Sequence, residues 1–266
     1  MLSPEEERGV LDLIPTEPNI DPLYDRGYHE SKIKYAQSFN PEFSRAEAWA
    51  ISMYLGPKTY CQGINRMLLG APMEDGERDK YQLISKAAQS ALSKIPDLTP
   101  EGIRELPQPD DRLPPAEYLK RFVHYPDEVL DKYQAGKKIT EPNFLSTTYW
   151  QAPVGQVKQY AEQANAVFHI HTKAAQSWGK YVDLIKRKAR EGEVLFPPET
   201  TFEVNERSDQ DYPIDVEGDE TRPMTVIDVQ EVDAQTDNTP KPDTPKPDTP
   251  KPNRKRRERN ANENEL

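Results

Sequence analysis

The chain of 266 residues contains a single cysteine, Cys61. One cysteine excludes an internal disulfide and any zinc site built on several cysteines. No apolar run approaches the roughly 20 residues that a membrane-spanning helix needs, which argues against a membrane span. The N-terminus, MLSPEEERGV, lacks the basic and apolar regions of a signal peptide. We therefore expect a cytoplasmic protein in the producing cell, or one delivered into a target cell by a non-classical route.

Hydrophobic residues are also scarce, at 35%, whereas the chain holds 26 prolines and a net charge of −11. This composition predicts that a sizeable part of the chain buries little surface. From residue 239 the sequence reads TPKPDTPKPDTPKP and then NRKRRERN. Proline at two positions of every five-residue repeat excludes helix and sheet, so the repeat is expected to be an extended spacer. We expect an N-terminal arm of undecided order at 1–40, a main domain at 41–233, and a disordered repeat linker and basic tail at 234–266.

Apolar spacing predicts helices in the first half of the main domain and strands in the second. The expected helices are 44–55, 60–69 and 81–95, and the expected strands are 118–123, 143–147, 166–172 and 192–196. Two further short strands are expected at 201–204 and 224–232. Residues 203–236 contain eleven acidic side chains and only two basic ones, both arginines, so the segment between the two strands is strongly charged. This order indicates an α+β domain in which the acidic stretch forms a loop. Neither G-x-G-x-x-G nor a Walker-type loop is present.

Three short segments carry the side chains that could act in chemistry. They are YLKRFV (118–123) with Arg121, FLSTTYW (144–150) with Ser146, and EGEVLFPP (191–198) with Glu191 and Glu193. Each alone also fits an ordinary role as a paired strand arginine, a hydroxyl bonded to nearby backbone, or an exposed acidic pair. In a strand-like Glu-x-Glu, the two side chains project from the same face. Such a pair can divide the tasks of stabilising a cation and accepting a proton.

Together these segments resemble the arginine–serine–glutamate class of mono-ADP-ribosyltransferases, similar to the catalytic domain of bacterial actin-modifying binary toxins. The matching positions are Arg121, the run Ser146-Thr147-Thr148, and the run Glu191-Gly192-Glu193. The resemblance runs from about residue 40 to residue 232 and includes EAWAISMYLGPKTYCQGINRMLLG (47–70). It departs from the class at Phe122, where many members have glycine, and at Thr148, where serine is usual. No aromatic residue stands shortly before Glu191, where many members place one.

The resemblance implies the fold of these toxins, with N-terminal helices packed on a two-sheet β core. It also implies that the protein cleaves NAD, its substrate, and transfers ADP-ribose to an acceptor, expected to be arginine of a target protein. The chain would then act as a toxin, effector or phage factor. The implied catalytic residues are Arg121, Ser146, Glu191 and Glu193, and the implied NAD contacts are Arg121, Phe122, Phe144, Ser146, Thr147 and Glu193.

In this scheme Arg121 would hold the diphosphate and Ser146 would orient a carboxylate. Glu193 would hold the ribose and stabilise its positive charge, while Glu191 would activate the acceptor. An NAD glycohydrolase on the same site and a catalytically inactive interaction module stay open as alternatives.

The acceptor is less constrained by the sequence. The basic run IKRKAR (185–190) precedes Glu191 and is consistent either with a helix end or with steering toward negative charge. A protein with an acidic surface is the first candidate acceptor and RNA is the second. His169 and His171 alternate in FHIHT, but no further ligand cluster stands near them, so we interpret them as packing or hydrogen-bonding residues and expect no metal site.

Overall fold

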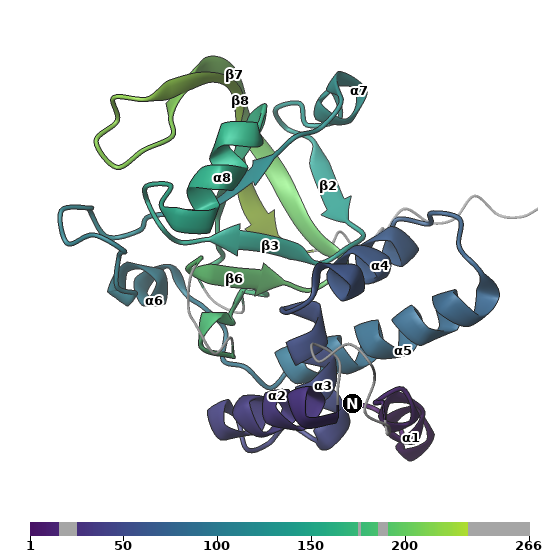
Figure 1. The fold of residues 1–266 in the computed structure, drawn as a ribbon. Coiled ribbons are helices and arrows are strands. Elements are labelled where there is room, and N and C mark those ends of the chain that lie inside the picture. The colour runs from purple at the N-terminus through teal and green to yellow at the C-terminus, as the bar shows by residue number, and fades with distance from the viewer. Residues whose placement is uncertain (16–25, 175–176, 186–190, 234–266) are drawn as a thin grey trace, which may run out of the picture. The chain divides into compact units, whose positions relative to one another are not determined.

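Five helices come first along the chain. The computed structural model describes residues 1–15, 26–174, 177–185 and 191–233, which belong to one compact unit. The helices are α1 (Pro4–Asp12), α2 (Arg26–Phe39), α3 (Arg45–Tyr54), α4 (Lys58–Leu68) and α5 (Asp75–Leu92), and they gather on one side of the strands (Figure 1). The three helices predicted from spacing correspond to α3, α4 and α5. Within the first 40 residues, α1 and α2 pack against the other helices through Val10, Ile33 and Ala36.

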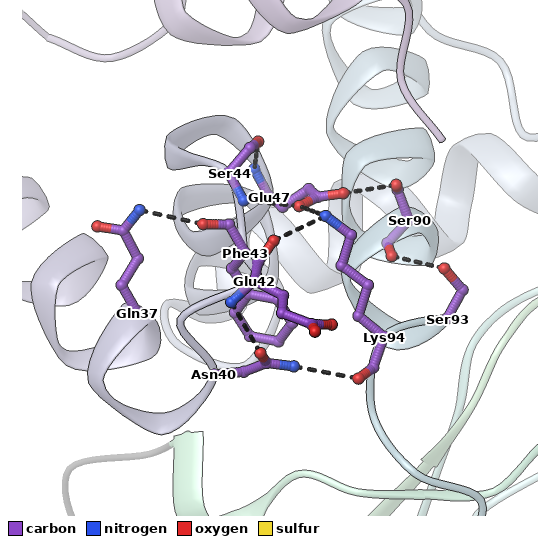
Figure 2. A network of polar contacts seen from close by, with 9 residues as sticks. All are labelled: Gln37, Asn40, Glu42, Phe43, Ser44, Glu47, Ser90, Ser93 and Lys94. Carbon is purple, nitrogen blue, oxygen red and sulfur yellow. Dashed lines mark hydrogen bonds and ion pairs between the residues drawn. The ribbon is translucent and has the colours of Figure 1, made fainter.

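A buried polar network ties the start of α3 to the end of α5 (Figure 2). Ser44 and Glu47 form a capping box at the N-terminus of α3. The Glu47 side chain, with 2% of its residue surface exposed, accepts hydrogen bonds from Ser90 Oγ and from Lys94 Nζ, both at 2.6 Å. Burial raises the pKa of Glu47, but the hydrogen bonds from Lys94 and Ser90 outweigh it and hold the pKa below its ordinary value.

Glycine lets α4 and α5 approach closely. A Cβ atom at Gly63 in α4 would lie 2.1 Å from the ring of Tyr81 in α5. Because real Cβ atoms do not come this close to another heavy atom, any larger residue would push the two helices apart.

The strands form one eight-stranded sheet in the order β2-β7-β8-β4-β1-β3-β6-β5. Their bounds are β1 (Leu119–Val123), β2 (Lys138–Glu141), β3 (Leu145–Thr148), β4 (Ala166–His171), β5 (Lys180–Tyr181), β6 (Glu193–Phe196), β7 (Thr200–Pro213) and β8 (Thr221–Val232). The short helices are α6 (Pro100–Glu105), α7 (Asp127–Leu130), α8 (Gly155–Gln163) and the 3₁₀ helix Asp183–Ile185. Only β4 and β8 pair in parallel among these strands. The α+β class is confirmed.

The junction between β1 and β3 changes the expected picture of two sheets. Five pairs of residues join β1 to β4, whereas the single pair Lys120–Thr148 joins β1 to β3. The expectation of two separate sheets is therefore wrong in this detail, since the hydrogen bonds run through all eight strands. The one-pair junction still lets β1 and β3 diverge on either side of it, because no further ladder bonds hold them together.

The two strands on either side of the acidic segment are longer than predicted. β7 and β8 pair over twelve positions, from Thr201–Val232 to Pro213–Thr221, with a bulge between Val204 and Glu206. The expected charged loop is therefore a long hairpin, and only 214–220 lie between the strands. Acidic side chains fit there because the far part of the hairpin is largely exposed to water.

Three apolar clusters hold these elements together. One cluster lies among the helices and includes Phe144, the residue before β3, and Leu195 of β6. A second lies against the strands, with Phe168 and Phe196 among its largest members, and a third places α8 on the sheet. Figure 1 shows α8 lying across the strands near β3. Within the described residues, no helix is long and apolar enough to cross a membrane.

Candidate active site

The site begins at Arg121, in the middle of β1. Its Nη1 donates a hydrogen bond of 2.7 Å to the carbonyl oxygen of Ser146 in β3. Its Nε is buried and has no hydrogen-bond partner among the described residues. Burial lowers the pKa of the guanidinium, but nearby Tyr125 and Glu141 offset this and raise the pKa above its ordinary value. Arg121 therefore keeps its charge inside the protein.

Ser146 joins this arginine to a buried carboxylate. Ser146 Oγ donates a hydrogen bond of 2.6 Å to Oε1 of Glu193, the first residue of β6, which is 4% exposed. The antiparallel register of β3 and β6 brings them together, with Ser146 opposite Leu195 and Thr148 opposite Glu193. The serine thus contacts the arginine through its backbone and the glutamate through its side chain.

The hydroxyl groups of the two threonines after Ser146 form hydrogen bonds with backbone carbonyl oxygens. Thr147 Oγ1 donates to the carbonyl oxygen of Val194 at 2.8 Å, and Thr148 Oγ1 donates to that of Glu191 at 2.5 Å. The two hydroxyls therefore tie β3 to Val194 in β6 and to Glu191 just before it. Replacing the usual serine by Thr148 keeps the hydroxyl that makes this bond.

Glu191 and Glu193 do not lie in one strand as expected, because the chain turns at Gly192 between them. β6 begins at Glu193, and Gly192 has a φ of 57°, in the left-handed region. A Cβ atom at Gly192 would lie 2.6 Å from the indole of Trp150. Because glycine alone meets both demands without strain, it allows the chain to turn sharply between the two acids.

A cavity of about 260 Å³ opens at the junction of β1 and β3. It is lined by Lys120, Arg121, Phe122, Ser146, Thr147, Thr148, Val157, Tyr160 and Glu191. Five predicted site residues therefore line one cavity, and Glu193 is connected to it through Ser146. The sequence separates these side chains by up to about 70 positions, and the pairing of β1, β3 and β6 brings them together.

Phe144 lies elsewhere. It is fully buried, its ring lies 4.5 Å from that of Tyr54 in α3, and it belongs to the cluster among the helices. Phe144, which was predicted to contact NAD, packs against the helices and is not among the residues that line the cavity. Phe122 does line it, with its ring edge-on to that of Tyr212, 6.0 Å away.

Lys120, Val157 and Tyr160 line the cavity but were not predicted as site residues. Lys120 had a signal in the sequence, since it puts a second cation beside Arg121 in an apolar strand. Val157 and Tyr160 of α8 gave none, because only the packing of α8 on the sheet brings them there.

Two other predictions concern histidines and the basic run. His169 lies 2.9 Å from the hydroxyl of Tyr212, and His171 lies 2.9 Å from a carboxylate oxygen of Asp228. Their interpretation as hydrogen-bonding residues is confirmed. Residues 186–190 and the repeat and tail at 234–266 lie outside the described residues.

The comparisons with known proteins concern the family and the fold. Residues 27–231 match the family model of the ADP-ribosyltransferase exoenzymes. No curated protein matches the sequence significantly.

Solved structures with low sequence identity share the fold. The type III effector XopAI from Xanthomonas axonopodis pv. citri is 16% identical, with a TM-score of 0.58 over 87% of this chain and 84% of that chain. The ADP-ribosyltransferase Vis from Vibrio splendidus, in complex with agmatine, is 16% identical, with a TM-score of 0.51 over 83% and 90%. A variant of the enzymatic component C2-I of the Clostridium botulinum C2 toxin is 18% identical, with a TM-score of 0.50 over 81% and 49%.

The family match covers most of the main domain and all three motif segments. It includes the strands that bring Arg121, Ser146 and Glu193 together. The chain belongs to the ADP-ribosyltransferase exoenzymes, a family of the bacterial toxin type whose substrate is NAD.

Proposed function

We propose that this protein is a mono-ADP-ribosyltransferase directed at arginine, with the chemistry centred on Glu193. The observation that carries this proposal is the chain of contacts from Arg121 through Ser146 to Glu193, beside a cavity that Glu191 also lines. It supplies a cation for the diphosphate, a fixed anion for the ribose and a second carboxylate at the open side.

The reaction breaks the bond between nicotinamide and ribose, and the bonding electron pair leaves with nicotinamide. Positive charge then develops on the ribose, as in other glycosyl transfers. The Glu193 carboxylate stabilises this charge, because a preorganised anion needs no reorganisation at the moment of reaction. The hydrogen bond from Ser146 fixes the rotamer of that carboxylate.

Glu191 is proposed as the base. A nitrogen of the acceptor guanidinium forms the new bond to the ribose and gives its proton to the Glu191 carboxylate. Glu191 lines the cavity and is partly exposed, whereas Glu193 is buried, so their environments suit different tasks. The structure of Vis with agmatine, an arginine mimic, supports an arginine acceptor by analogy of fold.

We infer that the acceptor belongs to a protein of a target cell, since XopAI is a type III effector and Vis and C2-I are toxins. The basic sequence KRKAR at 186–190 favours an acidic protein surface as the acceptor, with RNA as the second candidate. Delivery by a non-classical route is part of the same proposal.

The test is release of nicotinamide from NAD by the purified protein, with and without agmatine. Wild type is expected to release nicotinamide faster when agmatine is added and to form ADP-ribosylagmatine. Glu193→Ala should abolish both. A matched control is Glu203→Gln, a half-exposed carboxylate on β7 remote from the cavity lining, which should behave as wild type.

The alternatives give different results in the same assay. Release that agmatine leaves unchanged, without a modified product, would support an NAD glycohydrolase and contradict the arginine acceptor. No release by a folded protein would support the inactive interaction module and contradict the proposal as a whole.

A further inference from the structure

Lys120 is a buried cation in the wall of the same cavity. It stands on β1 beside Arg121 and is 5% exposed. In the sheet it lies opposite Thr148 on β3 and His169 on β4, at the one-pair junction where the cavity opens. Lysine is almost never buried to this extent unless it is paired.

The contacts that Lys120 makes with the described residues include no anion. Its Nζ donates a hydrogen bond of 2.5 Å to the carbonyl oxygen of Gln151 and lies 5.7 Å and 5.5 Å from the ring centroids of Tyr118 and Tyr212. No carboxylate oxygen of the described residues lies within 4 Å of Nζ. A carbonyl dipole and two aromatic faces stabilise an ammonium, but they do not neutralise it.

Burial has the expected consequence for the lysine, since it lowers the pKa of Lys120 to about 8. The titratable and charged groups around it are Tyr118 just before β1, Arg121 on β1, His169 on β4, Tyr212 on β7, Tyr160 on α8 and Glu191 in the cavity lining. Burial lowers the pKa of His169 to about 4 and raises those of Tyr118 and Tyr212, so these three stay neutral near pH 8.

We propose that Lys120 is a second phosphate-binding residue of this site, which takes one phosphate of the NAD diphosphate while Arg121 takes the other. This inference rests on the proposed placement of NAD in the cavity. Two phosphates carry two negative charges, and one guanidinium neutralises only one of them. Besides Arg121, Lys120 is the other basic residue among the described residues that line the cavity. Its energetic cost in the free protein would be offset when the anion binds.

The experiment measures binding of ADP and of adenosine by calorimetry to wild type, Lys120→Met and Lys120→Arg. ADP keeps the diphosphate but lacks the bond that the reaction breaks, so this measurement does not depend on transfer to arginine. Lys120→Met should weaken ADP binding about 10- to 100-fold, the scale of one charged hydrogen bond, and leave adenosine binding within twofold. Lys120→Arg should retain ADP affinity within about fivefold, because arginine also binds phosphate.

The pH dependence separates this role from a structural one. Lys120 must be protonated to bind phosphate, so the Kd of wild type for ADP should rise as the pH increases above about 8. Lys120→Arg should remove this rise, because arginine stays charged. Lys120→Met should not lower the melting temperature at pH 7, because it replaces the buried ammonium group by an apolar side chain of similar size.

Several results would overturn the inference. These are ADP binding by Lys120→Met within twofold of wild type, equal losses for ADP and adenosine, the same pH slope in wild type and Lys120→Arg, or no ADP binding by wild type at millimolar concentration. Failure of the arginine proposal alone would instead appear as normal ADP binding without any agmatine product.

Discussion

Two regions of this protein bury charged side chains, and they do so in opposite ways. Between α3 and α5, Glu47 has Lys94 as its counter-ion and further bonds from Ser90 and the backbone of Ser44. Between β1 and β3, Arg121 keeps a buried Nε without a partner among the described residues, and Lys120 has only a carbonyl oxygen and aromatic rings. A buried charge with complete partners supports the fold, whereas an incompletely paired one is suited to receive a ligand.

The largest effect is expected for two buried carboxylates that are similarly hidden, Glu193 at 4% and Glu47 at 2% exposure. Glu193→Gln should lower turnover of NAD about 10²- to 10⁴-fold, because the neutral amide no longer stabilises the ribose cation, while the melting temperature changes little. Glu47→Gln should lower the melting temperature and keep turnover within twofold. Steady-state kinetics and thermal unfolding of both variants test this. A lower melting temperature with normal turnover for Glu193→Gln, or lost turnover with a normal melting temperature for Glu47→Gln, would contradict it.

A smaller effect, divided between two reactions, is expected at Glu191. Glu191→Ala should lower transfer to agmatine about 100-fold, because the acceptor loses its base, and lower NAD hydrolysis less than tenfold. Quantifying ADP-ribosylagmatine and free ADP-ribose in one reaction mixture gives both rates. Equal losses in the two products would show that the acids do not divide the work as proposed.

Next comes the turn that separates the two acids. Gly192→Ala places a Cβ 2.6 Å from the Trp150 indole at a positive φ, which should cost about 1–3 kcal/mol in the free energy of unfolding and lower turnover about tenfold. Gly76→Ala is the control, since nothing lies within 4 Å of its Cβ and its φ is ordinary. Denaturant unfolding and nicotinamide release of both variants test this, and a stability of Gly192→Ala equal to that of Gly76→Ala would contradict it.

The smallest effect should be confined to stability. Lys94→Ala leaves the buried Glu47 without its counter-ion and should cost about 1–3 kcal/mol in the free energy of unfolding with turnover unchanged. Lys86→Ala removes an exposed ion pair with Glu6 and should change the stability less. The pKa of Glu47 is lowered from 4.5, so its stabilising contribution is present above that pH and is lost as the pH falls through the lower, folded-state pKa. The difference between wild type and Lys94→Ala should therefore shrink in acid, as followed by unfolding at pH 3 to 7.

Much of the helical layer could be predicted from the sequence. The capping box at Ser44 and the apolar spacing of α3 to α5 are local signals, because a helix is built from contacts three and four residues apart. The strand segments with Arg121, Ser146 and Glu193 were also predicted, by their alternation and by the resemblance to a family. Strands 201–204 and 224–232 were predicted, but the extension of β7 to Pro213 and of β8 to Thr221 was missed, because the exposed acidic side chains there hide the strand pattern.

The sequence by itself determined which residue types are available for the reaction and in which order they stand. Tertiary structure decided which of them meet. It placed Phe144 behind β3 and Lys120 at the cavity, and it turned the chain at Gly192 between Glu191 and Glu193. The physical reason is that strand pairing joins residues far apart in the chain, and no local pattern encodes which strand lies beside which.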